Sequence, residues 1–346
     1  MINIQDHIIN KHATIGEALV MLNNLSDESM TLFVVDDSDV MIGTVTDGDI
    51  RRLLIRKGAL EDMVMCAMNV NFYFIKDNDI NVAIIKKHRN LGITLLPLLD
   101  EHYKIKNIYN LKILKSILPI DAVIMAGGKG VRLRPLTEKT PKPLLPVGDK
   151  TIIDYNVDSL ISYGVLNINV TINYLKEQIE THFEHPRNGI RIKCIPEPQY
   201  LGTLGSIRFI DTFYNDTILV MNSDLFTNIN YEDFYLYFKE SNADMSVAAI
   251  PYTISIPYGV LEFDGNKVNG IKEKPSYNYY SNAGIYLIKK ELLSLIPSNS
   301  FFNATEFMEL LISKGYKVTH FPITGYWIDI GKHEDYKKVQ DLIKHL

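Results

Sequence analysis

The chain has 346 residues, of which 46% are hydrophobic and 22% charged, as is typical of a folded protein of about two domains. Its formal net charge of -5 argues against nucleic acid as a partner but leaves room for a local basic pocket. No apolar stretch is long enough to span a membrane, and the first residues do not resemble a signal peptide. We therefore expect a cytoplasmic protein with no membrane partner.

Residues 1–118 are predicted to form a smaller domain of two similar units. The first unit comprises a helix at 15–25, strands at 32–35 and 41–45, and a helix at 50–56; the second comprises a helix at 80–89, strands at 92–99 and 104–108, and a helix at 111–118. Thr14 is the expected N-cap of the first helix, with Glu17 completing a capping box. Neither unit has enough core alone, so we expect the two to pack on each other.

The first unit closes with GTVTDGDIRR, Gly43 to Arg52, which resembles the end of a CBS domain. A CBS pair would form an α+β domain, and such pairs often dimerise, so the resemblance implies a homo-oligomer. It also assigns Thr46 and Asp49 to the phosphate and ribose of an adenine nucleotide. The second unit departs from this pattern, with Tyr109 and Lys112 in those places, so at most one nucleotide site is expected. Alternatively, Thr46 and Asp49 only cap a helix, and the domain is a dimerisation module.

The two cysteines, Cys66 and Cys194, lie far apart and outside any CxxC or Cys/His spacing. This spacing predicts neither a zinc site nor a disulfide. We expect both to be buried apolar thiols.

The pattern changes at Pro119, from which strands and helices alternate through residues 119–346. The expected strands are 122–125, 167–172, 190–195, 217–221 and 243–250, and the expected helices include 152–163 and 175–183. This alternation predicts an α/β layered fold, in which ligands gather at the carboxyl ends of the strands.

A glycine-rich loop follows the first of these strands. Ala126, Gly127, Gly128 and Gly130 let the backbone approach a ligand closely, and free N–H groups there form an anion nest. This loop does not match a P-loop. It does not match the dinucleotide-binding fingerprint either, because Leu133 stands where that fingerprint has its third glycine.

Two cations follow the glycines within the same stretch, Asp121 to Gly148. Arg132 can bind phosphate oxygens with two donors, and Lys142 is held between two prolines that restrict the backbone. This stretch closely resembles the signature of sugar-nucleotide pyrophosphorylases, which join a sugar 1-phosphate to a nucleoside triphosphate and release pyrophosphate. The resemblance extends to the end of the chain and implies a Rossmann-like, GT-A-like domain with a mixed central sheet.

Further residues fall in the order of that family's motifs. Asp224 ends an apolar strand and Asp329 lies in the segment WIDIG, and two such carboxylates with phosphate oxygens suit Mg²⁺. The resemblance places the sugar phosphate against Lys274 and the sugar against Gly259, Glu273 and Asn282. A phosphate nucleophile is already ionised, so we expect direct in-line displacement in which Arg132, Lys142 and Lys274 neutralise charge.

The segment EPQYLGTLGS sits where the family reads its nucleobase, and it resembles the form found in guanylyltransferases. Glu197, Gly202 and Thr203 are therefore expected at the base of GTP, with UTP, dTTP and CTP as alternatives. A CBS pair ahead of such a transferase resembles the glucosamine-1-phosphate guanylyltransferases of bacterial legionaminic acid synthesis, and mannose 1-phosphate is the second candidate sugar.

Two rival classes remain open. A nucleotide-sensing protein without catalysis would be expected to have lost Arg132, Lys142, Asp224 or Asp329, yet all are present. A glycosyltransferase of similar fold would usually carry an Asp-x-Asp motif, and the segment Asn222-Ser223-Asp224 is not one.

Overall fold

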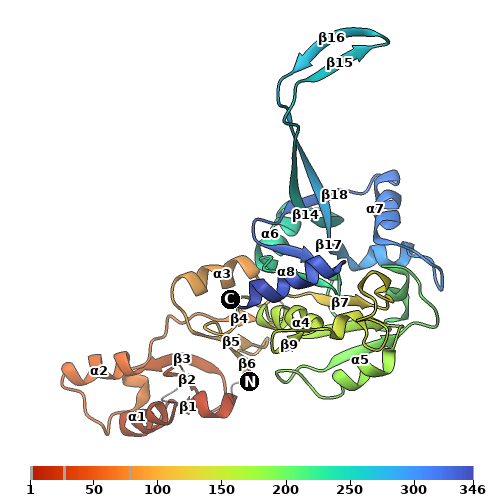
Figure 1. Cartoon of the computed structure of the whole chain (residues 1–346). Coiled ribbons are helices and arrows are strands. Elements are labelled where there is room, and N and C mark those ends of the chain that lie inside the picture. Colours follow the sequence, from red (N-terminus) through yellow and green to blue (C-terminus); the bar gives the residue numbers. More distant parts are fainter. Residues whose placement is uncertain (1–2, 26–28, 78, 346) are drawn as a thin grey trace. The chain divides into compact units, whose positions relative to one another are not determined.

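The computed structural model describes residues 3–25, 29–77 and 79–345, so residues 1–2, 26–28, 78 and 346 lie outside it. The chain divides into two compact units, Met1–Leu118 with Ser162–Gly164, and Pro119–Ile161 with Val165–Leu346. Each unit is described by itself (Figure 1). Over the described residues, no helix combines the length and the apolar character needed to cross a membrane.

The first unit contains the expected repeat. Its elements are β1 (Ile8–Asn10), α1 (Ile15–Asn24), β2 (Thr31–Val35), β3 (Met41–Thr46), α2 (Asp47–Ile55), β4 (Ile75–Lys76), α3 (Val82–Asn90), β5 (Leu95–Leu99) and β6 (Ile105–Asn110). β2 pairs parallel with β1 and antiparallel with β3, and β5 pairs in the same way with β4 and β6. Both central strands shift register at their last residue, so the two halves share one topology.

The two halves also share a hydrophobic core, as expected. Phe33 and Met41 from the first half pack with Leu95, Leu99 and Ile108 from the second. Burial of these side chains removes from water the apolar face of each three-stranded sheet, which neither sheet can cover alone.

Two predictions for this chain are wrong: the second half has no closing helix, and the two cysteines are not both buried. Residues 111–118 form turns and irregular backbone rather than a helix, and Pro119 disfavours helical backbone at Leu118. Their apolar spacing reflects packing: Leu111 and Ile117 are buried in a core with Ile85. Cys66 is exposed rather than buried, and Cys194 is partly buried, where burial raises the pKa of its thiol to about 11.

The second unit is built on a mixed sheet of order β11-β10-β7-β12-β17-β14-β18, in which only β17 runs against its neighbours. These strands are β7 (Asp121–Ala126), β10 (Asn167–Ile172), β11 (Ile192–Pro196), β12 (Thr217–Asn222), β14 (Met245–Ser255), β17 (Ser276–Lys289) and β18 (Val318–Pro322). The shorter strands are β8 (Pro146–Val147), β9 (Lys150–Thr151), β13 (Leu225–Thr227), β15 (Val260–Asp264), β16 (Lys267–Lys272) and β19 (Trp327–Asp329). The mixed α/β sheet predicted from the sequence is therefore confirmed.

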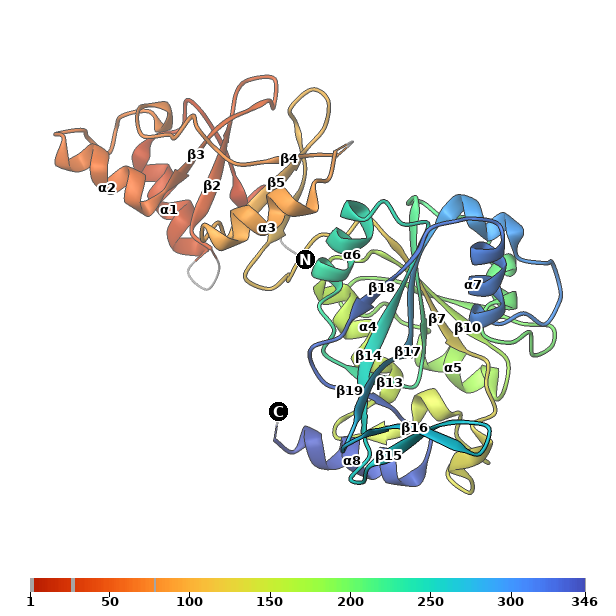
Figure 2. The same cartoon turned by 90° about the horizontal axis from the view of Figure 1, so that it is seen from above.

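Helices cover both faces of this sheet. They are α4 (Ile152–Ser162), α5 (Lys176–His182), α6 (Tyr231–Glu240), α7 (Ala304–Ser313) and α8 (His333–Ile343). Figure 2 shows α4 and α6 on one side of the sheet and α7 on the other. Because side chains alternate along a strand, Val220 of β12 faces a core with Phe307 of α7, whereas the next residue, Met221, contacts Tyr231 of α6.

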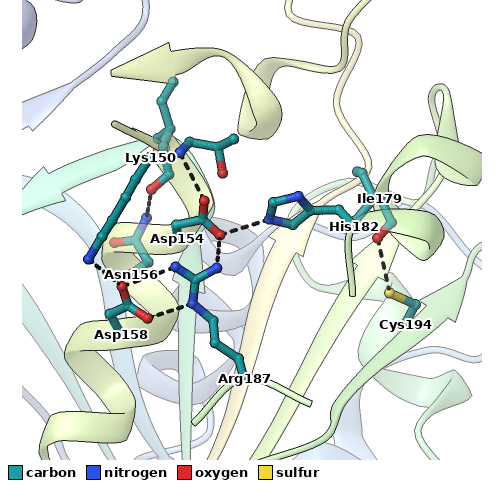
Figure 3. Close-up of polar contacts among 10 residues, drawn as sticks. Lys150, Asp154, Asn156, Asp158, Ile179, His182, Arg187 and Cys194 are labelled. Carbon is teal, nitrogen blue, oxygen red and sulfur yellow. Dashed lines mark hydrogen bonds and ion pairs between the residues drawn. The ribbon is translucent and has the colours of Figure 1, made fainter. Parts of the chain in front are cut away.

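A buried ionic cluster ties α4 to the segments around it (Figure 3). The Asp154 carboxylate lies 2.7 Å from His182 Nε2 and 2.5 Å from Arg187 Nη1, and it accepts a hydrogen bond from the Thr151 amide at 2.9 Å. Asp158, one turn later on α4, accepts from Arg187 Nε at 2.6 Å. Burial would raise the pKa of Asp154, but hydrogen bonds from His182 and Thr151 outweigh it and lower the pKa to about 2.

Because of this cluster, the free energy of unfolding depends on pH under acidic conditions. Since the folded pKa of Asp154 is about 2 and the unfolded value is near 3.8, its contribution is complete above pH 4 and disappears as the pH falls toward 2. The contribution is about 2 kcal/mol. We expect urea denaturation to show that the difference in free energy of unfolding between wild type and Asp154→Asn becomes smaller from pH 5 to pH 3. The exposed control Asp211→Asn should have the same free energy of unfolding as wild type at every pH. A difference that stays constant with pH for Asp154→Asn would contradict the low pKa of Asp154.

Candidate active site

A cavity of about 640 Å³ lies at the carboxyl edge of the central sheet, where β7 and β12 end. Parallel strands bring the residues that follow them to one edge, which is where ligands bind in open α/β sheets. Of the residues predicted from the sequence, the cavity is lined by Ala126, Gly127, Gly128, Gly130, Arg132, Lys142, Glu197, Gly202, Thr203, Asp224 and Asp329.

The glycine-rich loop needs its glycines for two different reasons. A Cβ on Gly127 would lie 2.7 Å from Glu197 Oε1, so a side chain would displace that carboxylate. Gly130 has a φ of 60° and, as the N-cap of a short helix at Val131–Leu133, packs against Lys142. The Thr137 hydroxyl donates to the Gly130 carbonyl at 2.7 Å and holds the loop. Within the described chain, the amides of Gly128, Lys129 and Gly130 have no acceptor, which suits an anion.

Lys142 places a buried positive charge among two acids. It opens a short helix, Lys142–Leu144, directly after Pro141, and the residue is 8% exposed. Its ammonium group forms an ion pair with Asp224 and lies 3.9 Å from Asp329 Oδ1.

The pairing of β13 with β19 sets the two acids side by side. Leu225 is opposite Asp329 in this ladder, and the Ile330 amide donates to the Asp224 carbonyl at 3.0 Å. Asp224 Oδ1 and Asp329 Oδ1 are both buried without a hydrogen-bond partner. Burial, and secondly the neighbouring Asp224, raise the pKa of Asp329. Two carboxylate oxygens without donors fit a hard cation, although the described residues contain no cluster of three acids, histidines or cysteines.

Glu197 forms the opposite wall. It follows β11 and is 5% exposed, and its carboxylate accepts from the Leu201 amide at 3.2 Å. Burial raises the pKa of Glu197 against the hydrogen bonds that it accepts. Its backbone carbonyl accepts from Asn173 at 3.3 Å, so the residue is fixed at the cavity wall.

Gly202 and Thr203 line the cavity but also hold the fold together. Gly202 has a φ of 78°, and a Cβ there would lie 2.7 Å from the Phe302 carbonyl. The Thr203 hydroxyl accepts from the Ala304 amide at 3.0 Å, at the start of α7. A short helix begins at Gly205, so this segment is also a glycine turn that opens a helix.

Four predicted residues lie outside the cavity. Gly259, Glu273 and Lys274 sit on an arm formed by β14 and β17 with the hairpin β15–β16 at its end, which projects from the sheet (Figure 1). A Cβ on Gly259 would lie 3.1 Å from Glu273 Oε2, so these two residues are neighbours. Asn282, at the base of the arm, donates to the Tyr286 hydroxyl at 2.9 Å. The expectation of one crevice containing all the cations is not met for Lys274, because the paired strands carry it away.

In the first unit, Thr46 and Asp49 are engaged with each other. The Thr46 hydroxyl and amide both donate to the Asp49 carboxylate, at 2.6 and 2.9 Å, in a capping box at the start of α2. Asp49 also pairs with Arg52 at 2.5 Å. The capping role considered from the sequence is thus present in the structure.

Among the lining residues that sequence reasoning did not assign to the site are Tyr200 and Asn222. Burial, and then the neighbouring Glu197, raise the pKa of Tyr200, whose ring is a flat surface at the cavity. Its position three residues after Glu197, within a segment already singled out, was the available signal. Asn222 ends β12, and a Cβ on Gly284 would lie 2.6 Å from its Nδ2, so this side chain points toward β17.

With this geometry established, comparison with known proteins identifies the class. The sequence model of the nucleotidyl transferase family matches residues 121–345, and the chain belongs to that family. Among solved structures, one called a Putative Glucose-1-Phosphate Thymidylyltransferase from Bacillus anthracis matches 66% of this chain and 96% of its own length, with a TM-score of 0.53. At 23% identity, that match supports the fold alone.

Several relatives carry more specific names. A Sulfolobus acidocaldarius protein whose name includes mannose-1-phosphate guanyltransferase is 32% identical over 64% of this chain and 62% of its own length. HddC from Yersinia pseudotuberculosis, complexed with GMP-PN, is 25% identical over 64% of this chain and 99% of its own, with a TM-score of 0.50. A UTP--glucose-1-phosphate uridylyltransferase from Synechocystis is 28% identical over 62% of this chain and 61% of its own length. The match covers under two thirds of the length of the Sulfolobus and Synechocystis relatives.

Proposed function

We propose that this chain transfers GMP from GTP to a sugar 1-phosphate and releases pyrophosphate. The observation that carries the proposal is one cavity lined by the glycine-rich loop, Arg132, Lys142 and the acid pair Asp224 and Asp329. Free amides and two cations bind phosphates, and the carboxylates are available for a metal ion. A sensor without catalysis would not need acids and cations converging in this way.

The reaction requires two anions to meet. An oxygen of the sugar phosphate attacks the α-phosphorus of GTP, and the bond from that phosphorus to the β-phosphate oxygen breaks as pyrophosphate leaves. The attacking oxygen is already ionised near neutral pH, so no side chain has to remove a proton. Arg132, Lys142 and the loop amides offset the repulsion and hold the phosphates in line.

We assign Mg²⁺ to Asp224 and Asp329, on the strength of their two buried oxygens without partners. When bound, it would supply further charge neutralisation to the phosphates. The ammonium group of Lys142 offsets part of the negative charge of the acid pair before substrates arrive.

GTP is the proposed nucleotide for two reasons. The buried Glu197 carboxylate at the cavity wall can accept hydrogen bonds from the N1–H and amino group of guanine, and the Tyr200 ring offers a surface on which a base can stack. Two relatives support this choice: the name of one includes guanyltransferase, and the structure of another was solved with GMP-PN. UTP is the alternative, from the uridylyltransferase relative.

For the sugar, we propose glucosamine 1-phosphate, with a product that feeds bacterial surface glycan and legionaminic acid synthesis. This rests on the resemblance of the two-part chain to enzymes of that pathway. Mannose 1-phosphate is the second candidate, supported by the names of several relatives.

The test is a pyrophosphate-release assay over a grid of nucleoside triphosphates and sugar 1-phosphates, with Mg²⁺ present. We expect the highest kcat/KM for GTP with glucosamine 1-phosphate. Release with UTP but not GTP would overturn the base assignment, and no release from any pair would overturn the enzymatic proposal.

Replacing Glu197 tests the base assignment directly. Glu197→Gln keeps the side-chain shape but replaces one carboxylate oxygen with an amide NH₂ group, which donates hydrogen bonds and cannot accept one from guanine. We expect kcat/KM for GTP to fall about 10- to 100-fold, with a smaller loss for ATP or UTP. The control is Glu177→Gln on α5, which should leave selectivity unchanged. Equal losses for all nucleotides would point to a structural role for Glu197.

We further propose that the first unit is a CBS-like pair that regulates or assembles the enzyme as a homo-oligomer. Its support is the shared topology of the two halves together with the signature around Thr46. An adenine nucleotide at this site would have to replace the hydrogen bonds between Thr46 and Asp49, since these occupy the groups that would hold it.

A further inference from the structure

The arm on the second unit extends beyond every other strand of the sheet. β14 pairs with β18 only as far as Ala249 but with β17 as far as Ser255. At about 3.3 Å per residue, residues 250–255 place the base of the hairpin roughly 20 Å beyond the sheet. Figure 1 shows β15 and β16 at the far end of this arm.

Large apolar side chains cover the arm without burying one another. Tyr258 is 73% exposed, and Phe263 and Ile271 are each 63% exposed. Further exposed members along the same arm are Tyr252, Ile254, Leu261, Val268 and Tyr279. A two-stranded ribbon alone is at best marginally stable in water, and an apolar surface of this kind marks a contact with another surface.

A complementary surface exists at the mouth of the cavity. Val131 and Tyr200 line the cavity, yet they are 56% and 46% exposed. Phe301 is also exposed, and its ring centre lies 5.9 Å from that of Tyr200. The chain therefore presents two apolar surfaces, one on the arm and one beside the site for which Glu273 and Lys274 are proposed.

The arm cannot serve its own cavity by a simple bend. Glu273 and Gly259 lie at the base of the hairpin, not at its tip, so rotation where the ribbon meets the hairpin leaves them roughly 20 Å from the sheet. Bringing them back would require the ribbon itself to fold, which breaks the continuous register from Ile250 paired with Ser281 to Ser255 paired with Ser276. A second copy can receive the arm with all of these pairs intact.

We propose that the arm of one chain covers the cavity of a second copy and supplies Glu273 and Lys274 to the sugar-phosphate side of that site. A two-fold arrangement makes the exchange mutual, so each of two sites is complete only in the dimer. Lys274 then adds positive charge where the sugar phosphate enters, and Tyr258, Phe263 and Ile271 are buried against the partner. This proposal rests on the proposed function for the role of the arm, but not for the association.

The association is tested by sedimentation of the full chain, with no substrate present. Wild type should be a dimer at micromolar concentration, and the double variant Phe263→Asp/Ile271→Asp should shift to monomer. Both side chains are exposed within one chain, so the substitutions should leave the thermal unfolding of the monomer unchanged. Ile312→Asp on α7, also an exposed isoleucine of this unit, is the matched control and should remain dimeric. A monomeric wild type overturns the proposal, and so does a double variant that stays dimeric and keeps wild-type activity, because a dimer held only by the first unit would lack the delivered Glu273 and Lys274.

The shared site is tested by mixing two impaired variants, Asp224→Asn and Lys274→Ala. In a mixed dimer, one cavity carries Asp224→Asn and receives the altered arm, while the other has an intact cavity and an intact arm. Half of randomly formed dimers are mixed, and each has one complete site, so co-expression should restore about a quarter of wild-type activity. An active wild type whose variants fail to complement overturns the exchange. If wild type is inactive with every substrate pair, the proposed function fails, and sedimentation alone decides the arm contact.

Discussion

Lys142→Ala is expected to lower kcat/KM for pyrophosphate release about 100- to 1000-fold, the usual effect of removing a buried group that stabilises charge in a transition state. Lys142 is 8% exposed, and its ammonium group is the cation closest to the acid pair. Without it, the phosphates of two substrates enter a cavity that still contains Asp224 and Asp329. The loss should fall mainly on kcat, because the repulsion is greatest when attack brings the two phosphates together.

Two comparisons separate charge from structure in this result. Lys142→Arg keeps the charge but changes its position, so it should recover only part of the activity. Lys139→Ala removes an exposed lysine from the same segment and should behave as wild type. Activity of Lys142→Ala within tenfold of wild type, in a protein with unchanged thermal unfolding, would remove Lys142 from the proposed reaction.

Local patterns predicted the parts of this protein whose geometry is fixed by short-range rules. The Thr14 and Glu17 capping box forms as expected, because both hydrogen bonds lie within one helical turn. The cavity also follows from such rules: the glycine-rich loop and Asp224 come after parallel neighbours β7 and β12, whose carboxyl ends must meet at one edge.

The arm could not be predicted from local pattern. The expected strand at 243–250 stops before Tyr252 and Ile254, since apolar spacing shows that a strand has a packing face but not which surface covers it. The same limit explains the absent helix at residues 111–118, where Leu111, Leu114 and Ile117 have helical spacing yet pack from non-helical backbone. In both places, tertiary or intermolecular packing decides what the sequence leaves open.

Asp224→Asn is expected to abolish metal-dependent turnover, with a loss of about 1000-fold or more, since it removes an anionic ligand while preserving shape. The physical basis is the pair of buried oxygens, Asp224 Oδ1 and Asp329 Oδ1, which have no hydrogen-bond partner among the residues that the structure describes. A buried polar atom without a partner costs about 1–3 kcal/mol, so the site is incomplete without a ligand. The substitution also removes the ion-pair partner of the buried Lys142, so the substrate-free variant should unfold at a lower temperature than wild type.

Binding of Mn²⁺, followed by electron paramagnetic resonance, tests this independently of turnover. The described residues offer two carboxylates and no third ligand of the usual kind, so phosphate oxygens must complete the coordination. Tight Mn²⁺ binding to wild type should therefore require a non-hydrolysable GTP analogue, and Asp224→Asn should lose that binding while Asp211→Asn retains it. Mn²⁺ binding by Asp224→Asn at wild-type strength would show that the metal site is elsewhere, since Asp329, the remaining member of the acid pair, could not hold the ion alone.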